Sequence, residues 1–214
     1  MSVLRQVAGY YSRIVHAPQA QEIEGCQLAH RRLLSLVETI DPASFSSASL
    51  MPGWSVAHVL THLALNAEAM CRRINAAAQN EIVDQYAGGH EGRANEINIG
   101  AARSPKEIKS DLKRWCDALD STFESIDALV WDRPVRTISG EEHPVRLLPF
   151  RRWREVEVHM VDLQAEFRPQ DWSDALVAAA LPRLIDGLAG RADDRELMAW
   201  LLGRGPAPSL ESWG

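Results

Sequence analysis

Two pairs of residues in this sequence have types and spacings that suit metal chemistry. His58 and His62 are four residues apart in "GWSVAHVLTHLALN", and Glu155 and His159 are four apart in "REVEVHMVDL". On a helix, residues four apart share one face, with Cβ atoms about 5–6 Å apart. Imidazole and carboxylate groups from two neighbouring helices can bind a divalent metal and leave one coordination position open. A site of two histidines and one glutamate is therefore one interpretation of these pairs.

A structural interpretation of the same residues stays open. A glutamate and a histidine at this spacing also form an ordinary interaction on a helix surface, and His58 could be a hydrogen-bonded core histidine. The first pair lacks the internal glutamate of the HExxH motif, so the signature of a metalloprotease is absent. The spacing alone does not decide between the two interpretations.

Four long helices are expected to position these side chains. Apolar periodicity and end signals place them at about Ala20–Ile40, Ser55–Gln79, Ser104–Leu129 and Pro149–Phe167. The third has the clearest start, since Ser104, Pro105 and Glu107 match a capping box with proline at the first helical position. Its predicted end is less sharply marked than its beginning.

The remaining segments complete a mainly α fold. Residues 131–148 predict a short β-hairpin before the fourth long helix, and Gly88 with Gly89 indicates a turn. A short helix before Pro18 and two helices after Ser173, at about 175–188 and 193–203, are also expected. We predict an up-and-down four-helix bundle in residues 1–170, followed by a short helical C-terminal segment, residues 171–214.

Composition limits the classes of partner and the cellular setting. The 214 residues carry a formal net charge of −6, which argues against nucleic acid as a partner. The run Arg151, Arg152 and Arg154 is interpreted as a solvated helix face. Three widely spaced cysteines suit a reducing cytoplasm, and no segment reaches the ~18 apolar residues of a membrane span. A cytoplasmic protein is therefore expected.

Longer stretches resemble a known family. "MPGWSVAHVLTHLALNAEAM", then "YAGGHEGRANEI", "RRWREVEVHMVDL" with "RPQDW", and the C-terminal "LMAWLLGRG" are similar to the mycothiol-dependent maleylpyruvate isomerases. These belong to the wider DinB-like group of metal-binding four-helix bundles. The resemblance covers nearly everything from Ala20 onward, and it implies a DinB-like fold.

The resemblance also implies roles for particular residues. The family's zinc ligands match His62, Glu155 and His159. It leaves His58 beside the ligands or in the pocket, with the alternative that His58 replaces His62 as a ligand or joins it. Asn66, one turn beyond His62, could hydrogen-bond the thiol cofactor or substrate, or could face solvent.

Other nearby residues divide between structural and functional roles. Asp162 could orient a ligand, although a structural ion pair with an arginine is favoured. Trp54 and Trp153 are interpreted as core anchors rather than as substrate-stacking residues. The family's C-terminal arginine, which handles substrate carboxylates, is best matched by Arg204; a helix-end charge is the structural alternative. Its rivals are Arg191 and Arg195.

The expected function is zinc-dependent and thiol-dependent cis–trans isomerisation of the maleylpyruvate isomerase type. The cofactors would be Zn²⁺, or another divalent metal such as nickel, cobalt or copper, and a low-molecular-weight thiol, mycothiol or glutathione. One alternative is a zinc-dependent thiol S-transferase, and metal-dependent hydrolysis is another. A third is a non-enzymatic bundle that binds a metal or small molecule. The partners would be small molecules, and a homodimer is possible on the behaviour of DinB-like bundles.

Overall fold

The computed structural model describes residues 19–210, which divide between two compact units. The first unit ends at Asp171, and the second begins at Trp172. The helix expected before Pro18 lies outside the described residues. The first unit contains four long helices, which are α2 (Ala20–Thr39), α3 (Val56–Ala78), α5 (Pro105–Ser125) and α6 (Leu148–Asp162).

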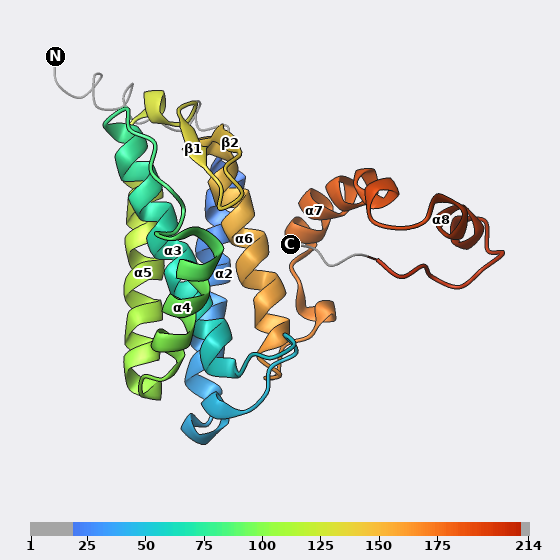
Figure 1. The fold of residues 1–214 in the computed structure, drawn as a ribbon, viewed down its shortest axis with the longest axis horizontal. Helices are drawn as coiled ribbons and strands as arrows, with labels where there is room; N and C mark the ends of the chain where they lie inside the picture. The colour runs from blue at the N-terminus through green and yellow to red at the C-terminus, as the bar shows by residue number, and fades with distance from the viewer. Residues whose placement is uncertain (1–18, 211–214) are drawn as a thin grey trace, which may run out of the picture. The chain divides into compact units, whose positions relative to one another are not determined.

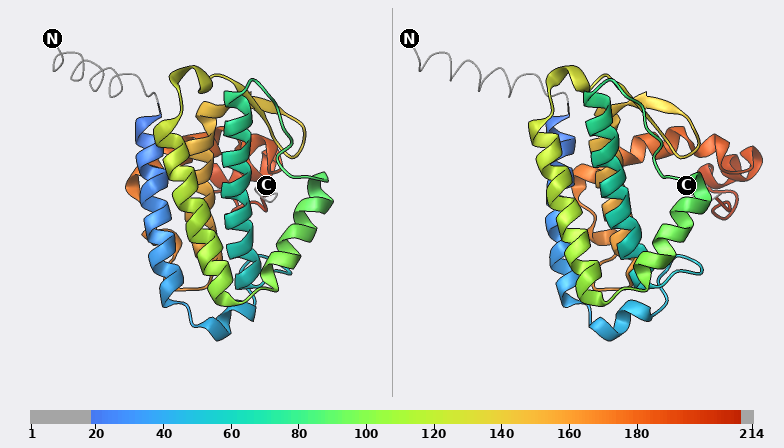
Figure 2. Two further views of the ribbon diagram at one scale, coloured as in Figure 1. Left: turned by 90° about the vertical axis from the view of Figure 1, so that its left-hand side faces the viewer. Right: turned by 60° about the vertical axis from the view of Figure 1, so that its left-hand side comes forward.

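The four long helices form a bundle in which each packs against two others. α2 contacts α5 and α6, and α3 contacts the same two helices from the other side. α2 and α6 run in one direction, while α3 and α5 run in the opposite direction (Figure 1). The two further views show the same arrangement of the bundle (Figure 2). The predicted mainly helical bundle is confirmed.

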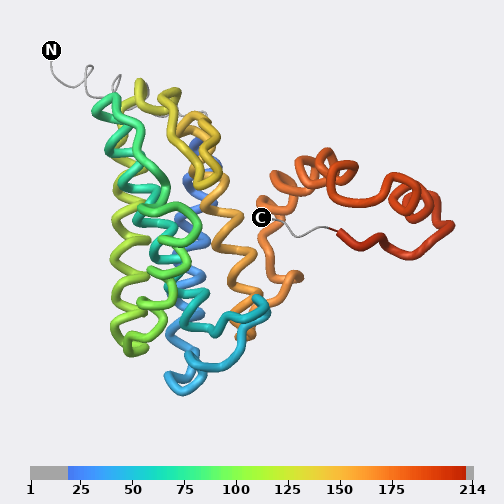
Figure 3. The backbone as a smooth tube through the Cα atoms, in the orientation of Figure 1, coloured from blue at the N-terminus to red at the C-terminus, as the bar shows by residue number. Residues whose placement is uncertain are grey.

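The parallel course of α3 and α5 depends on a helix that the sequence did not predict. α4 (Gly89–Ala101) carries the chain back along α3 before α5 begins (Figure 3). Gly100 permits this close packing, because a Cβ atom added there would lie 2.4 Å from Cγ2 of Thr61. Only Ile97 and Gly100 of α4 are buried, so the sequence of this helix has no apolar stripe to reveal it. The predicted turn before it is confirmed, since Gly88 and Gly89 both have positive φ.

Local hydrogen bonds fix where α3 and α5 begin. At α5 the capping box is confirmed, with the Ser104 N–H donating to Glu107 Oε2 at 2.9 Å. At α3 the corresponding place is taken by His58, whose Nδ1 accepts the N–H of Ser55 at 3.3 Å. α5 ends at Ser125 rather than near Leu129, because Asp127 caps a separate 3₁₀ turn.

The predicted hairpin is also present. Strands β1 (Pro134–Arg136) and β2 (Glu142–Pro144) pair antiparallel, with Val135 opposite His143. α6 follows after one 3₁₀ turn and ends at Asp162, five residues before the predicted end. The hairpin lies at the end of the bundle where α6 begins (Figure 1).

The second unit contains the two helices expected after Ser173. These are α7 (Asp174–Asp186), capped by the Ser173 side chain, and α8 (Asp194–Leu201), capped by Asp193. Among the described residues, no helix is both long enough and apolar enough to span a membrane.

Candidate metal centre

Three side chains predicted as metal ligands converge between α3 and α6. His62 projects from α3, and Glu155 and His159 project from one face of α6. Oε1 of Glu155 lies 2.9 Å from Nε2 of His62 and 3.6 Å from Nε2 of His159. The two imidazole rings meet edge to face with centroids 5.0 Å apart. One ligand atom from each residue falls within 4.8 Å of the others, which is close enough for all three to hold one ion.

Burial and mutual contacts set the charges of this cluster. Burial lowers the pKa of His62, and contacts with Glu155 offset this only in part, which favours the neutral imidazole that binds metals. Burial would raise the pKa of Glu155, but hydrogen bonds and charges from His159 and His62 hold it well below its ordinary value. Burial opposes protonation of His159, yet Asp162 and Glu155 raise its pKa to about 9. The cluster therefore offers an anionic carboxylate and two buried imidazoles.

Asp162 orients one of these imidazoles. Its Oδ2 accepts a hydrogen bond from Nδ1 of His159 at 2.8 Å, so Nε2 is the ring nitrogen that faces Glu155 and His62. Metal-binding histidines commonly hold their second nitrogen in this way. The structural ion pair with an arginine, favoured for Asp162 from the sequence, is wrong, because its carboxylate binds His159 one turn earlier on α6.

Replacing Asp162 with asparagine is expected to weaken zinc binding by about 10–100-fold, the usual effect of losing such a partner. Asparagine keeps the size of the side chain but loses the charge that favours a proton on Nδ1. Competition with a chromophoric chelator measures the change. Exposed Asp132 on the hairpin side provides a control, and Asp132→Asn should leave the affinity unchanged. Equal affinities for Asp162→Asn and the native protein would show that Asp162 does not support a ligand.

Arg93 is a residue of the site that sequence reasoning missed. It lies on α4, and its Nη2 donates to Nδ1 of His62 at 3.1 Å. Its guanidinium also lies over the rings of Trp54 and Tyr86, at 5.8 and 5.7 Å from their centroids. The only signal for Arg93 was its place in "YAGGHEGRANEI", because α4 itself has no apolar pattern.

The two tryptophans have different environments. Trp153 is a core anchor as predicted, since it is 2% exposed and Gly25 packs directly against its ring. Trp54 is only half-buried, and its ring meets the ring of His62 edge to face at 5.6 Å. Trp54 therefore forms part of the wall of the site.

The structure does not bring His58 and Asn66 into the cluster. His58 binds Ser55 through Nδ1 and stacks on Trp54, with ring centroids 6.4 Å apart. Asn66 is buried, and its Oδ1 accepts a hydrogen bond from Arg152 at 3.0 Å. Cofactor binding by these two residues remains a prediction, and both side chains have structural partners.

The predicted substrate arginine lies in the second unit. Arg204 is exposed and donates to the carbonyl oxygen of Gly203 at 3.3 Å. Arg195 is also exposed, and Arg191 is half-buried. A role for any of the three remains a prediction.

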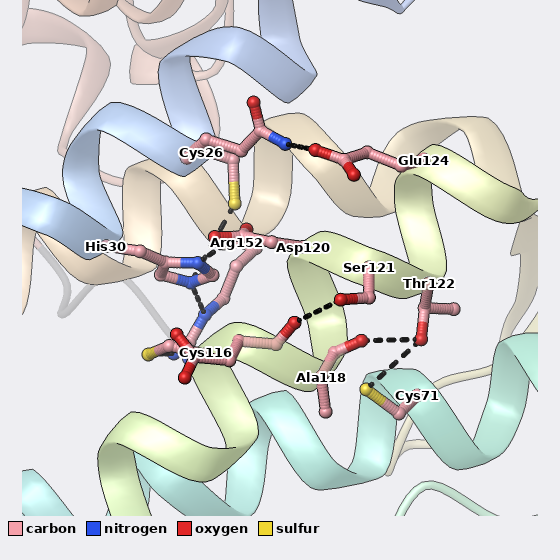
Figure 4. A network of polar contacts seen from close by, with 12 residues as sticks. Cys26, His30, Cys71, Cys116, Ala118, Asp120, Ser121, Thr122, Glu124 and Arg152 are labelled. Carbon is pink, nitrogen blue, oxygen red and sulfur yellow. Dashed lines mark hydrogen bonds and ion pairs between the residues drawn. The ribbon is translucent and has the colours of Figure 1, made fainter.

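A second set of potential ligands gives a useful contrast. Cys26, His30 and Asp120 also converge, but Nε of Arg152 donates to Nε2 of His30 at 3.0 Å (Figure 4). Both ring nitrogens of His30 are therefore occupied, because Nδ1 binds Asp120 at 2.8 Å. Arg93 contacts only Nδ1 of His62, so Nε2 of that ring still faces Glu155, and the set of His62, Glu155 and His159 fits a divalent metal such as zinc.

Comparisons with known proteins identify the family of this chain. Residues 26–164 match the model of the mycothiol maleylpyruvate isomerase N-terminal domain. The crystal structure of the mycothiol-dependent maleylpyruvate isomerase superposes with a TM-score of 0.72 and 26% identity, covering 76% of this chain and 67% of that chain. A structure of that enzyme with one histidine replaced by alanine gives the same TM-score and coverage at 25% identity. The comparison with curated proteins gave no match. The chain therefore belongs to the family of the mycothiol maleylpyruvate isomerase N-terminal domain.

Proposed function

We propose that this protein is a zinc-dependent and thiol-dependent cis–trans isomerase acting on maleylpyruvate or a closely related unsaturated keto diacid. The observation that carries the proposal is the convergence of His62, Glu155 and His159 within a chain of this family. Three protein ligands leave a coordination position open, as catalytic zinc sites do. The hydrogen bond between His58 and Ser55 supports a count of three protein ligands, because His58 as a fourth ligand would close the site.

The metal and the thiol supply the nucleophile. A free thiol has a pKa near ~8.5, and a divalent metal held by the three residues would deprotonate a coordinated thiol at neutral pH. Such a thiol would supply a nucleophile for reversible addition to the activated cis double bond, and its elimination after rotation about that bond would leave the trans alkene.

Arg93 has a role that follows from its hydrogen bond to His62. Because it donates to Nδ1, the metal-free imidazole carries its proton on Nε2, where it faces Glu155. If Nε2 held a metal, the proton would sit on Nδ1, which could then no longer accept from Arg93. The guanidinium, which lies over the rings of Trp54 and Tyr86, would then be available for a substrate carboxylate.

The transferase alternative uses the same cluster, so activity must separate it from the isomerase. The purified protein is assayed for zinc content and then for isomerisation of maleylpyruvate with mycothiol and with glutathione, beside thiol transfer to an electrophile. We expect about one equivalent of zinc and thiol-dependent isomerisation, both lost in the variant with His62, Glu155 and His159 replaced by alanine. Thiol transfer without isomerisation would favour the transferase. A folded native protein that binds no zinc would contradict both enzymatic mechanisms.

A further inference from the structure

A second group of charged side chains gathers where the hairpin meets α3 and α6. Arg73 of α3 is 2% exposed, and its Nη1 donates to the carbonyl oxygen of Arg136 in β1 at 3.0 Å. Arg151 of α6 is half-buried, and its Nη1 lies 3.2 Å from Nε2 of His143 in β2. His143 pairs with Val135, the neighbour of Arg136 in β1. The hairpin therefore holds the two guanidinium groups at adjacent places.

No carboxylate in the described part of the chain forms a hydrogen bond or an ion pair with either of these two cations. Within residues 19–210, the hydrogen-bond partners of Arg73 and Arg151 are carbonyl oxygens and one imidazole. Burial is the main cause that lowers the pKa of Arg73 to about 10, and the positive charges of Arg151 and Arg72 contribute to this against a raising effect of Tyr86. Burial also lowers the pKa of Arg151, which the exposed Glu141 offsets only in part. Removing two like charges from water in this way raises the free energy of the folded state unless an anion pairs with them.

The pair faces the same seam between α3 and α6 as the metal cluster. Arg151 precedes Glu155 by four residues, and Arg73 follows His62 by eleven, so each lies on the same helix face as its ligand. The rise of an α-helix places Arg151 about 6 Å along the axis from Glu155, and it places Arg73 about 16 Å along the axis from His62. A dicarboxylate of about four to six carbons can bridge the shorter span, so Arg151 is the arginine within its reach.

We propose that Arg151 and His143, with the positive charge of Arg73 behind them, form a subsite for one carboxylate of a short dicarboxylate whose reactive end lies at the metal cluster. The inference rests on the proposed function and adds how the substrate is selected. Arginine suits this task, because its planar fork can hold both oxygens of a carboxylate. A substrate with a single carboxylate would leave this subsite empty.

Calorimetric titration of the metal-free full chain with maleate tests the subsite. Arg151→Gln is expected to weaken maleate binding at least about tenfold, since it removes a charged donor. Arg151→Lys keeps the positive charge but loses the planar guanidinium that can bind both carboxylate oxygens. It should therefore weaken maleate binding less than Arg151→Gln does. Arg114→Gln is the matched control, because Arg114 is exposed on α5 and pairs with Asp111. Its affinity should equal that of the native protein.

Two results would contradict the proposed subsite. A separate zinc titration shows whether the proposed metal centre fails as well. The subsite is wrong if the native protein does not bind maleate, or if Arg151→Gln binds it within twofold of the native affinity. Zinc titration of the same proteins tests the metal centre, which Arg151→Gln should leave intact. Normal zinc binding with unchanged maleate affinity would reject the subsite alone, whereas absent zinc binding in the native protein would reject the metal centre alone.

Discussion

Replacing Glu155 with glutamine is expected to reduce zinc affinity by more than about 100-fold, beyond the loss seen when a supporting partner of a ligand is removed. The amide keeps the shape of the side chain, but it removes the only carboxylate in the set His62, Glu155 and His159. It also removes the negative charge that both imidazoles contact. Chelator competition measures the affinity, and circular dichroism checks that the helices remain.

A neighbouring glutamate on the same helix provides the control. Glu157 is fully buried and pairs with Arg32 of α2 at 2.7 Å, away from the cluster of ligand atoms. Glu157→Gln makes the same chemical change two residues along α6, and it should keep native zinc affinity. If both variants bind zinc as the native protein does, the carboxylate of Glu155 is not a ligand.

The sequence predicted the parts of this site that depend on local helix geometry. The spacing of Glu155 and His159 placed both on one face of a helix, and the structure confirms it. Bringing His62 opposite them requires the packing of α3 against α6, which no local pattern encodes. The resemblance to the family supplied that partner, and the geometry agrees with it.

The residues that the sequence missed depend on tertiary packing. Arg93 lies on a helix with almost no buried side chains, so periodicity could not place it. The solvated face predicted for Arg151, Arg152 and Arg154 is wrong for Arg152, which is 0% exposed. The arginines of this single helical turn look alike in the sequence, and only the positions of α2 and α3 decide which of them enters the core.

Arg152 occupies the centre of a buried polar network that joins three helices to α6. It donates to His30 of α2 at 3.0 Å, and to the carbonyl oxygen of Leu63 and Oδ1 of Asn66 in α3 at 2.9 and 3.0 Å. Its Nη2 also lies 3.6 Å from Sγ of Cys116 in α5 (Figure 4). Because Arg152 donates to Nε2 of His30, that imidazole carries its proton on Nδ1 and donates it to Asp120 at 2.8 Å. The carboxylate of Asp120 thus balances the buried guanidinium through the ring.

Arg152→Met is therefore expected to lower the free energy of unfolding by about 3–5 kcal/mol, the usual cost of breaking a buried charge pair. Methionine fills much of the volume, but it leaves His30 and Asn66 without their donor. Urea unfolding measures the loss, and Arg114→Met on the exposed face of α5 should change stability by less than about 0.5 kcal/mol. Adding Asn66→Leu to Arg152→Met should recover part of the loss, because it removes an orphaned amide from the core. A loss below about 1 kcal/mol in the single variant would mean that the network does not depend on the guanidinium charge.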